Sequence, residues 1–255
     1  MHLTRDGVRL AHDDAGSGSP PIVFVHGWCC DRSYLAPQMA HFSRSHRCMA
    51  LDLRGHGESD APEQEYSIAG FADDIAWTCA ELAIEKPVVV GHSMGGAVAL
   101  SLAVRHPELP AAIVMLDGAL VWPATMTARP DPTSAALHSD ACEQTLANIF
   151  TGMFLASDVV RKEQVIAGAR SFPRHVAASE WDAMAAYDSA GDAAKCRVPA
   201  LYVGAAAPIA DMRRLRELMP HVALAQTAGA GHFHQLEVPD QVNAMIERFM
   251  LISGV

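Results

Sequence analysis

The chain has 255 residues, of which 50% are hydrophobic and 19% are charged, a composition typical of a globular protein with one sizeable core. Its net charge of −10, with no basic cluster, argues against nucleic acid or an anionic membrane surface as a partner. The first residues lack the apolar segment of a secretory signal, and no apolar run reaches the length of a membrane span, so we expect a cytoplasmic protein.

Short apolar runs alternate along the chain with longer helix-like stretches, as in βαβ units around a parallel sheet. Residues 8–12 alternate in period two and predict an antiparallel strand at the edge of that sheet. The buried strands are predicted at residues 22–25, 48–51, 88–90, 113–116, 201–203 and 222–225. The pattern indicates an α/β fold with about eight mostly parallel strands flanked by helices.

The strand pattern stops for about eighty residues after Asp117, where helix-like segments at 133–154 and 157–169 take over. Prolines separate these segments, as expected where loops connect helices. We therefore predict a helical cap of residues 120–194, inserted into a core of residues 1–119 and 195–255.

The pentapeptide Gly91-His92-Ser93-Met94-Gly95 lies between the predicted strand 88–90 and a helix-like segment at 97–104. Strand, G-x-S-x-G and helix in this order form the nucleophile elbow pattern, in which small residues let strand and helix approach each other closely. The pattern predicts that Ser93 is a nucleophile and that the Met94 N–H faces a developing oxyanion at the helix N-terminus.

His232 lies in a glycine-rich loop after the last predicted strand, and the helix opened by Pro239 follows it. A histidine at this place can reach the elbow and serve as general base, because its ordinary pKa is near neutral. After the strand 22–25, the Trp28 N–H is the candidate for the second oxyanion donor. A metal site of His232 and His234 lacks a third ligand at a suitable spacing, and we expect neither metal nor cofactor.

These motifs resemble the α/β-hydrolase superfamily over nearly the whole chain. The resemblance rests on residues 26–28, 52–59 (DLRGHGES), 91–96 and 231–232 in this order. In the family, the loop that corresponds to residues 52–59 has a scaffold role, so the resemblance implies that its polar side chains are structural.

The sequence departs from the family at the acid of the catalytic triad. The family's aspartate usually follows the strand that corresponds to residues 201–203, but here that stretch reads Gly-Ala-Ala-Ala-Pro at 204–208. We prefer Asp117, which ends the strand after the elbow helix, because some branches of the superfamily carry their acid there. Asp211 is the second candidate, and a turn or cap role for Asp117 stays open.

The residues together predict a serine hydrolase of the carboxylesterase or lactonase type, which cleaves a small ester, lactone or amide through an acyl-enzyme. We expect a monomer or homodimer acting on a small molecule. Candidate pocket residues in the cap are Trp122, Met126, Phe150, Met153, Phe154, Phe172 and Trp181, with Arg129, Arg170 and Arg174 as candidates for binding a substrate carboxylate.

Two other functions fit parts of the sequence. A cofactor-independent dioxygenase acting on an N-heteroaromatic compound fits residues 27–29 and an acid at Asp117. Against it, the residue after Ser93 is Met94, where the resemblance to those enzymes would imply a histidine. A non-catalytic ligand-binding member would need no acid, but Ser93 and His232 weigh against it. Dehalogenases and epoxide hydrolases of this fold would need an aspartate at the position of Ser93.

Overall fold

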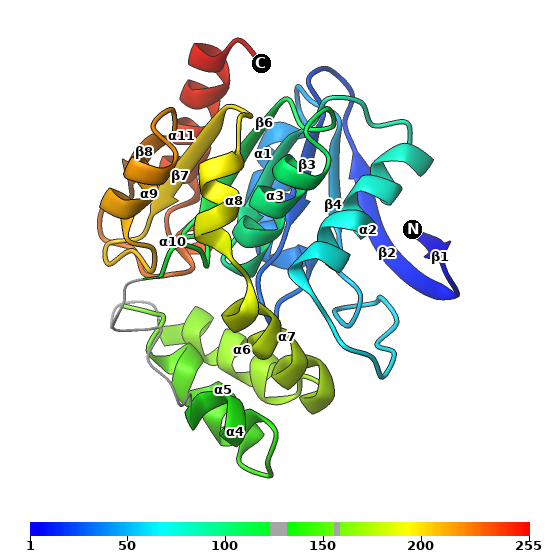
Figure 1. Ribbon diagram of the computed structural model, residues 1–255, viewed down its shortest axis with the longest axis vertical. Helices are drawn as coiled ribbons and strands as arrows, with labels where there is room; N and C mark the ends of the chain where they lie inside the picture. The colour runs from blue at the N-terminus through cyan, green and yellow to red at the C-terminus, as the bar shows by residue number, and fades with distance from the viewer. Residues whose placement is uncertain (123–131, 156–158) are drawn as a thin grey trace.

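The computed structural model describes residues 1–122, 132–155 and 159–255, and its centre is one eight-stranded sheet (Figure 1). The strand order is β1-β2-β4-β3-β5-β6-β7-β8. Strands β3 to β8 pair with one another in parallel, whereas β1 and β2 are antiparallel to their neighbours. The strands are β1 (His2–Arg5), β2 (Val8–Ala15), β3 (Ile22–Val25), β4 (Cys48–Leu51), β5 (Val88–His92), β6 (Ala112–Leu116), β7 (Ala200–Gly204) and β8 (Ala223–Gln226).

Helices cover both faces of the sheet, so its central strands are buried on both sides and read as continuous apolar runs. Alternate residues of each central strand belong to two separate hydrophobic clusters. In β3, Val23 and Val25 belong to one, and Ile22 and Phe24 to the other. The first cluster includes residues of α2 (Ile68–Glu81), α3 (Met94–Arg105), α8 (Ser189–Lys195) and α9 (Met212–Leu218), and the second includes residues of α1 (Ala36–Phe42) and α11 (Pro239–Ser253).

The predicted fold class is confirmed, and every predicted buried strand is present with ends shifted by at most two residues. One detail is wrong. Residues 8–12 belong to β2, which is not the edge strand, because β1 pairs with its outer side. Strand β1 was not predicted, since it is only four residues long and its residues are exposed or half-buried.

The longer helices begin and end at residues that favour helix termini. The Ser67 hydroxyl accepts a hydrogen bond from the Gly70 N–H and caps α2. Proline occupies the first position of α11, and Gly254 ends this helix with a left-handed φ of 71°. All six cysteines are free and buried.

Between β6 and β7 the described part of the chain is helical. Figure 1 shows α4 (Pro132–Leu137), α5 (Cys142–Thr151), α6 (Val159–Arg170) and α7 (Arg174–Ala186) gathered beyond one end of the sheet, opposite the C-terminus. The predicted helix 133–154 is two helices, α4 and α5. The helix α8, although within the predicted cap, packs against α3 and α9 of the core. The boundaries 120 and 194 remain a prediction.

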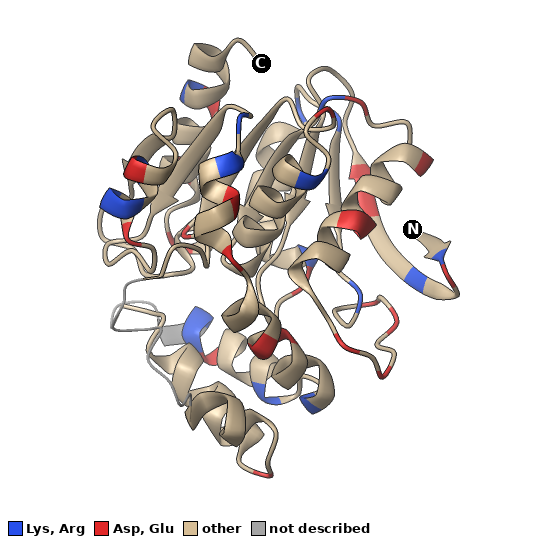
Figure 2. Ribbon diagram, in the orientation of Figure 1, with Lys and Arg blue, Asp and Glu red and all other residues tan. Residues whose placement is uncertain are grey.

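Acidic and basic residues are interspersed along the ribbon in the view of Figure 2, and no basic stripe follows a helix or a sheet edge there. Many of the basic side chains pair locally with carboxylates. Arg54, for example, binds the buried Asp74 with two hydrogen bonds of 2.5 and 2.7 Å. None of the helices in the described ranges is both long and apolar enough to cross a membrane.

Helix α7 connects the cap to the core through a buried acid. The side chains of Glu180 on α7 and His56 after β4 are wholly buried, and Oε2 of Glu180 lies 3.2 Å from Nε2 of His56. Burial raises the pKa of Glu180 well above its ordinary value, although the nearby His175 acts in the opposite sense. Burial also lowers the pKa of His56 to about 4. Burial thus favours the neutral form of both side chains.

The substitution Glu180→Gln tests this pair, because glutamine keeps the shape of the side chain and does not titrate. The folded state retains a proton on Glu180 that the unfolded chain releases above about pH 4.5, so wild-type stability decreases as the pH rises from there toward the raised pKa. We expect the unfolding free energy of the variant, relative to wild type, to increase between about pH 5 and pH 8, by at most about 1.4 kcal/mol per pH unit. Urea denaturation at both pH values measures the difference, and a pH-independent difference contradicts the prediction.

Candidate active site

Ser93 lies at a sharp turn between β5 and α3, and its backbone has φ 54° and ψ −119°. This strained conformation is held by hydrogen bonds on both sides of the residue. The Ser93 N–H donates to the Leu116 carbonyl at 3.0 Å, and the Ser93 carbonyl accepts from the N–H groups of Gly96 and Ala119 at 2.9 Å each. The turn therefore has the strand, turn and helix order that the sequence predicted for the elbow.

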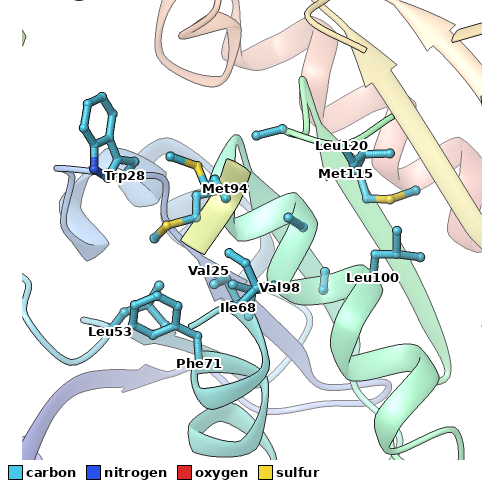
Figure 3. Packing of buried hydrophobic residues seen from close by; sticks show 14 of the residues in the cluster. Val25, Trp28, Leu53, Ile68, Phe71, Met94, Val98, Leu100, Met115 and Leu120 are labelled. Atoms are coloured by element: carbon cyan, nitrogen blue, oxygen red, sulfur yellow. The ribbon is translucent and has the colours of Figure 1, made fainter. Parts of the chain in front are cut away.

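Glycine is required on both sides of Ser93 for a steric reason. A Cβ atom on Gly91 would lie 2.0 Å from the Gly95 carbonyl oxygen, and one on Gly95 would lie 2.2 Å from the Val25 carbonyl oxygen. Strand β5, helix α3 and the end of β3 thus approach each other at backbone distance. Figure 3 shows the result beyond the turn, where Met94 and Val98 of α3 pack near Val25 of β3.

Asp117 and His232 are in direct contact, although they are 115 residues apart in the chain. Oδ2 of Asp117 lies 2.7 Å from Nδ1 of His232. Oδ1 accepts hydrogen bonds from the Tyr202 hydroxyl at 3.2 Å and from the N–H groups of Ala205 and Ile209 at 3.3 Å. The carboxyl group is buried, and its position is defined from both β7 and the loop after it.

The environment of Asp117 favours the ionised carboxylate. Burial by itself raises the pKa of Asp117, but the hydrogen bond and the charge of His232, the charge of His234 and the Ala205 N–H outweigh it. The net effect is a pKa below the ordinary value. A carboxylate that stays ionised can hold the proton of His232 on Nδ1, which leaves Nε2 as the basic atom.

Asp211, the second candidate for the acid, lies at a different place. Its carboxylate accepts a hydrogen bond from the Arg214 N–H at 2.9 Å and caps helix α9. The alanine stretch 204–208 also has a part in the site, since Ala205 supplies an N–H to Asp117 where the family has its acid. Of the two aspartates, the structure brings only Asp117 to His232.

The backbone of His232 is held as firmly as its side chain. Its N–H donates to the Met153 carbonyl, next to the end of α5, at 2.8 Å. Its carbonyl oxygen lies 2.9 Å from Nε2 of His92. The preceding Gly231 N–H donates to the Glu237 carboxylate at 3.0 Å.

Ser93 and His232 line one small cavity between the sheet and the cap. The other lining residues are Trp28, Cys30, His92, Phe150, Met153 and Phe233. The free volume in this cavity is about 10 Å³, which is room for roughly one water molecule. Aromatic rings form its wall: Phe150 stacks on Trp28 at 5.8 Å and on Phe233 at 6.1 Å.

The two candidate oxyanion donors lie on segments that meet beside Ser93. A Cβ on Gly27 would lie 3.0 Å from the Cβ of Ser93, so the loop after β3 touches the elbow. The N–H groups of Trp28 and Met94 have no acceptor within the described parts of the chain. The Trp28 indole is fixed separately, because its Nε1 donates to the Ala177 carbonyl on α7 at 3.0 Å.

The structure divides the residues predicted to line a pocket. Phe150 and Met153 line the cavity, whereas Phe172 packs on His56 at 4.9 Å and Trp122 on Trp181 at 6.3 Å. Phe154 stacks behind the cavity on Phe233, with ring centres 4.9 Å apart. Met126 and Arg129 lie outside the described residues. The exposed Arg170 and Arg174 form ion pairs with Glu143 and Asp140.

Cys30, His92 and Phe233 also line the cavity, and the sequence analysis did not propose them for it. Each is within two residues of a predicted site residue, and this nearness is the only signal that the sequence offers.

Residues 52–59 form a scaffold below the site. The buried Asp52 carboxylate accepts hydrogen bonds from the N–H groups of Arg32 at 2.7 Å and Glu58 at 2.8 Å, and it also binds the Arg32 guanidinium. The Ser59 hydroxyl donates to the Asp52 carbonyl at 2.7 Å. These contacts bind the loop to itself and to the residues after β3, as the resemblance implied.

Comparison with protein families now identifies the class to which this fold and site belong. The sequence model of the α/β-hydrolase fold family matches residues 20–239. The chain belongs to this family. Its predicted membership of the α/β-hydrolase superfamily is confirmed.

Individual relatives are more distant. The AB hydrolase superfamily protein YisY of Bacillus subtilis is 38% identical over 40% of this chain and 38% of that protein. The 2-(acetamidomethylene)succinate hydrolase of Mesorhizobium japonicum is 30% identical over 61% of this chain and 50% of that protein. The match thus spans half or less of the length of these two curated relatives.

A solved structure matches over the whole fold. The enol-lactonase from Burkholderia xenovorans LB400 has a TM-score of 0.86 and 24% sequence identity, with 98% of this chain and all of that chain covered. At this identity, the likeness shows the shared fold alone.

The part of the chain that the structure describes contains no group of three or more His, Cys, Asp or Glu side chains that could hold a metal ion.

Paired substitutions at the two aspartates test the role of the buried carboxylate. Asp117→Asn removes the charge beside Nδ1 of His232 and allows the wrong tautomer, so we expect kcat for an activated ester to decrease by about 10⁴-fold. Asp211→Asn is the matched control, and asparagine also caps helices, so it should retain nearly all activity and stability. Hydrolysis of p-nitrophenyl acetate by both folded variants gives the answer. Wild-type activity of Asp117→Asn would exclude this acid.

Proposed function

We propose that the protein is a serine hydrolase that cleaves a small ester, lactone or amide through an acyl-enzyme on Ser93, with His232 as general base and Asp117 as the acid of the triad. The observation that carries this proposal is the 2.7 Å contact between Asp117 and Nδ1 of His232, beside a cavity that Ser93 also lines. It directs Nε2 of His232 to the role of proton acceptor.

In the first half of the reaction, Oγ of Ser93 attacks the acyl carbonyl carbon while Nε2 of His232 takes the hydroxyl proton. The carbonyl electron pair moves onto oxygen, and the N–H groups of Trp28 and Met94 stabilise this oxyanion. As the tetrahedral intermediate collapses, His232 gives its proton to the departing alkoxide or amine. The acyl group stays on Ser93.

In the second half, His232 removes a proton from water, and the resulting hydroxide attacks the acyl carbon of the ester on Ser93. Collapse of the second tetrahedral intermediate breaks the bond to Oγ, which takes back the proton from His232. The products are a carboxylic acid and the free enzyme. The low pKa of Asp117 supports this cycle, because the acid stays ionised while His232 is transiently protonated.

The cavity beside Ser93 supports a substrate with a short apolar acyl group. Its wall consists mainly of the apolar side chains of Trp28, Phe150, Met153 and Phe233, and its free volume is about 10 Å³. Arg170 and Arg174 are exposed and are paired with acidic side chains, which gives no support to a carboxylate-binding role for them. The match to a hydrolase from Mesorhizobium japonicum supports hydrolysis as the reaction class.

Ser93→Ala tests the nucleophile. We expect the variant to lose ester hydrolysis and to resist labelling by a fluorophosphonate, which reacts only with an activated serine. Ser101→Ala, a buried serine farther along α3, is the matched control and should be labelled like wild type. Labelling of the Ser93 variant, or an unreactive folded wild type, would contradict the proposed function and favour an oxygenase or a binding protein.

A series of p-nitrophenyl esters tests the predicted size of the acyl site. We expect kcat/KM to decrease from acetate through butyrate to hexanoate, because the wall beside Ser93 leaves little space. Phe150→Ala removes one ring of that wall, and its kcat/KM for hexanoate relative to acetate should increase by about 10-fold or more. An unchanged ratio in this variant would show that Phe150 does not limit the acyl group.

A further inference from the structure

His92 stands directly before Ser93 in the elbow and is wholly buried. Its Nε2 lies 2.9 Å from the carbonyl oxygen of His232, and the centres of the two imidazole rings are 4.7 Å apart. The residue next to the proposed nucleophile therefore has a direct polar contact with the backbone of the proposed base.

The partners of the ring define its tautomer. A carbonyl oxygen can only accept a hydrogen bond. Nε2 of His92 therefore carries the proton and donates a hydrogen bond to the His232 carbonyl oxygen. Nδ1 has no hydrogen-bond partner in the described residues and stays unprotonated. Burial, followed by the charge of His232, lowers the pKa of His92 well below its ordinary value, so the ring stays neutral in this tautomer.

The contact is the one described link between the elbow and the backbone carbonyl of His232. Two other groups restrain His232: Asp117, directly after β6, binds Nδ1, and the Met153 carbonyl of the cap accepts from the backbone N–H. Asp117 is also connected to the elbow, because its neighbours Leu116 and Ala119 hydrogen-bond to the Ser93 backbone, but it holds the ring of His232 and not its carbonyl. A proton transfer between Ser93 and His232 depends on their distance and alignment, and an error of about 1 Å can cost about 10²-fold in rate.

We propose that His92 is a positioning residue that sets the distance and alignment of His232 relative to Ser93 through its hydrogen bond to the His232 carbonyl. This inference rests on the proposed hydrolase function. His92 takes no proton in the reaction and acts through His232. Its loss therefore lowers the rate of the chemical step, whereas the binding of a small ester is largely retained.

Three substitutions separate the hydrogen bond from the bulk of the ring. The amide nitrogen of His92→Gln reaches the position of Nε2 and can donate to the same carbonyl, whereas that of His92→Asn reaches only the position of Nδ1. His92→Phe keeps a ring without a donor. We expect His92→Asn and His92→Phe to lower kcat for p-nitrophenyl acetate by about 10- to 100-fold with little change in KM. We expect His92→Gln to retain most of the wild-type kcat.

A proton NMR measurement gives a readout that does not require turnover. The proton between Asp117 and Nδ1 of His232 should give a far-downfield resonance in wild type and in His92→Gln, which is shifted or broadened in the Asn and Phe variants. His12→Phe, which replaces another buried histidine far from the elbow on β2, is the control and should leave both the resonance and kcat unchanged.

Thermal unfolding of each variant shows whether it is folded under the assay conditions. Equal kcat and an equal resonance in wild type, His92→Phe and His92→Asn would overturn the positioning role, and so would a loss that Gln fails to restore while its fold is intact. Failure of the hydrolase proposal looks different: wild type itself would be inactive, and the resonance would still report whether His92 positions His232.

Discussion

The close approach of β5, α3 and the end of β3 is the constraint on which the rest of the site depends. Two glycines make it possible, since a single Cβ at Gly91 or Gly95 would come within 2.0 to 2.2 Å of a backbone oxygen. The approach forces Ser93 into a left-handed conformation that its hydrogen bonds to neighbouring segments maintain. It also brings the loop after β3 against the elbow, where the N–H groups of Trp28 and Met94 have no acceptor among the residues that the structure describes.

Around this point, the structure compensates the buried polar groups of the proposed acid and base. Asp117 would be costly to bury as an anion, but three hydrogen-bond donors besides His232 surround its carboxylate. His232 is held at its ring, its N–H and its carbonyl oxygen. Such a network favours one arrangement of the base, because any movement of His232 leaves several buried groups without a partner.

The cap contributes more than a cover over the sheet. Its α5 ends next to Met153, whose carbonyl binds the His232 N–H, and its α7 binds the Trp28 indole. Two of the proposed functional residues are thus connected to both the core and the cap. The aromatic rings of Phe150 and its neighbours form a wall of the cavity beside Ser93, so the packing of the cap shapes the space next to the proposed nucleophile.

The sequence by itself determined the family, the fold class, the buried strands and the elbow, because these depend on local patterns: apolar periodicity, glycine spacing and the order of strand, turn and helix. It proposed Asp117 but left Asp211 open, since nothing local tells a carboxylate that caps a helix from one that meets a histidine 115 residues away. It also missed β1 and the part of His92 in the site. Only the tertiary structure decided these points, because each depends on contacts between segments that the chain brings together from distant positions.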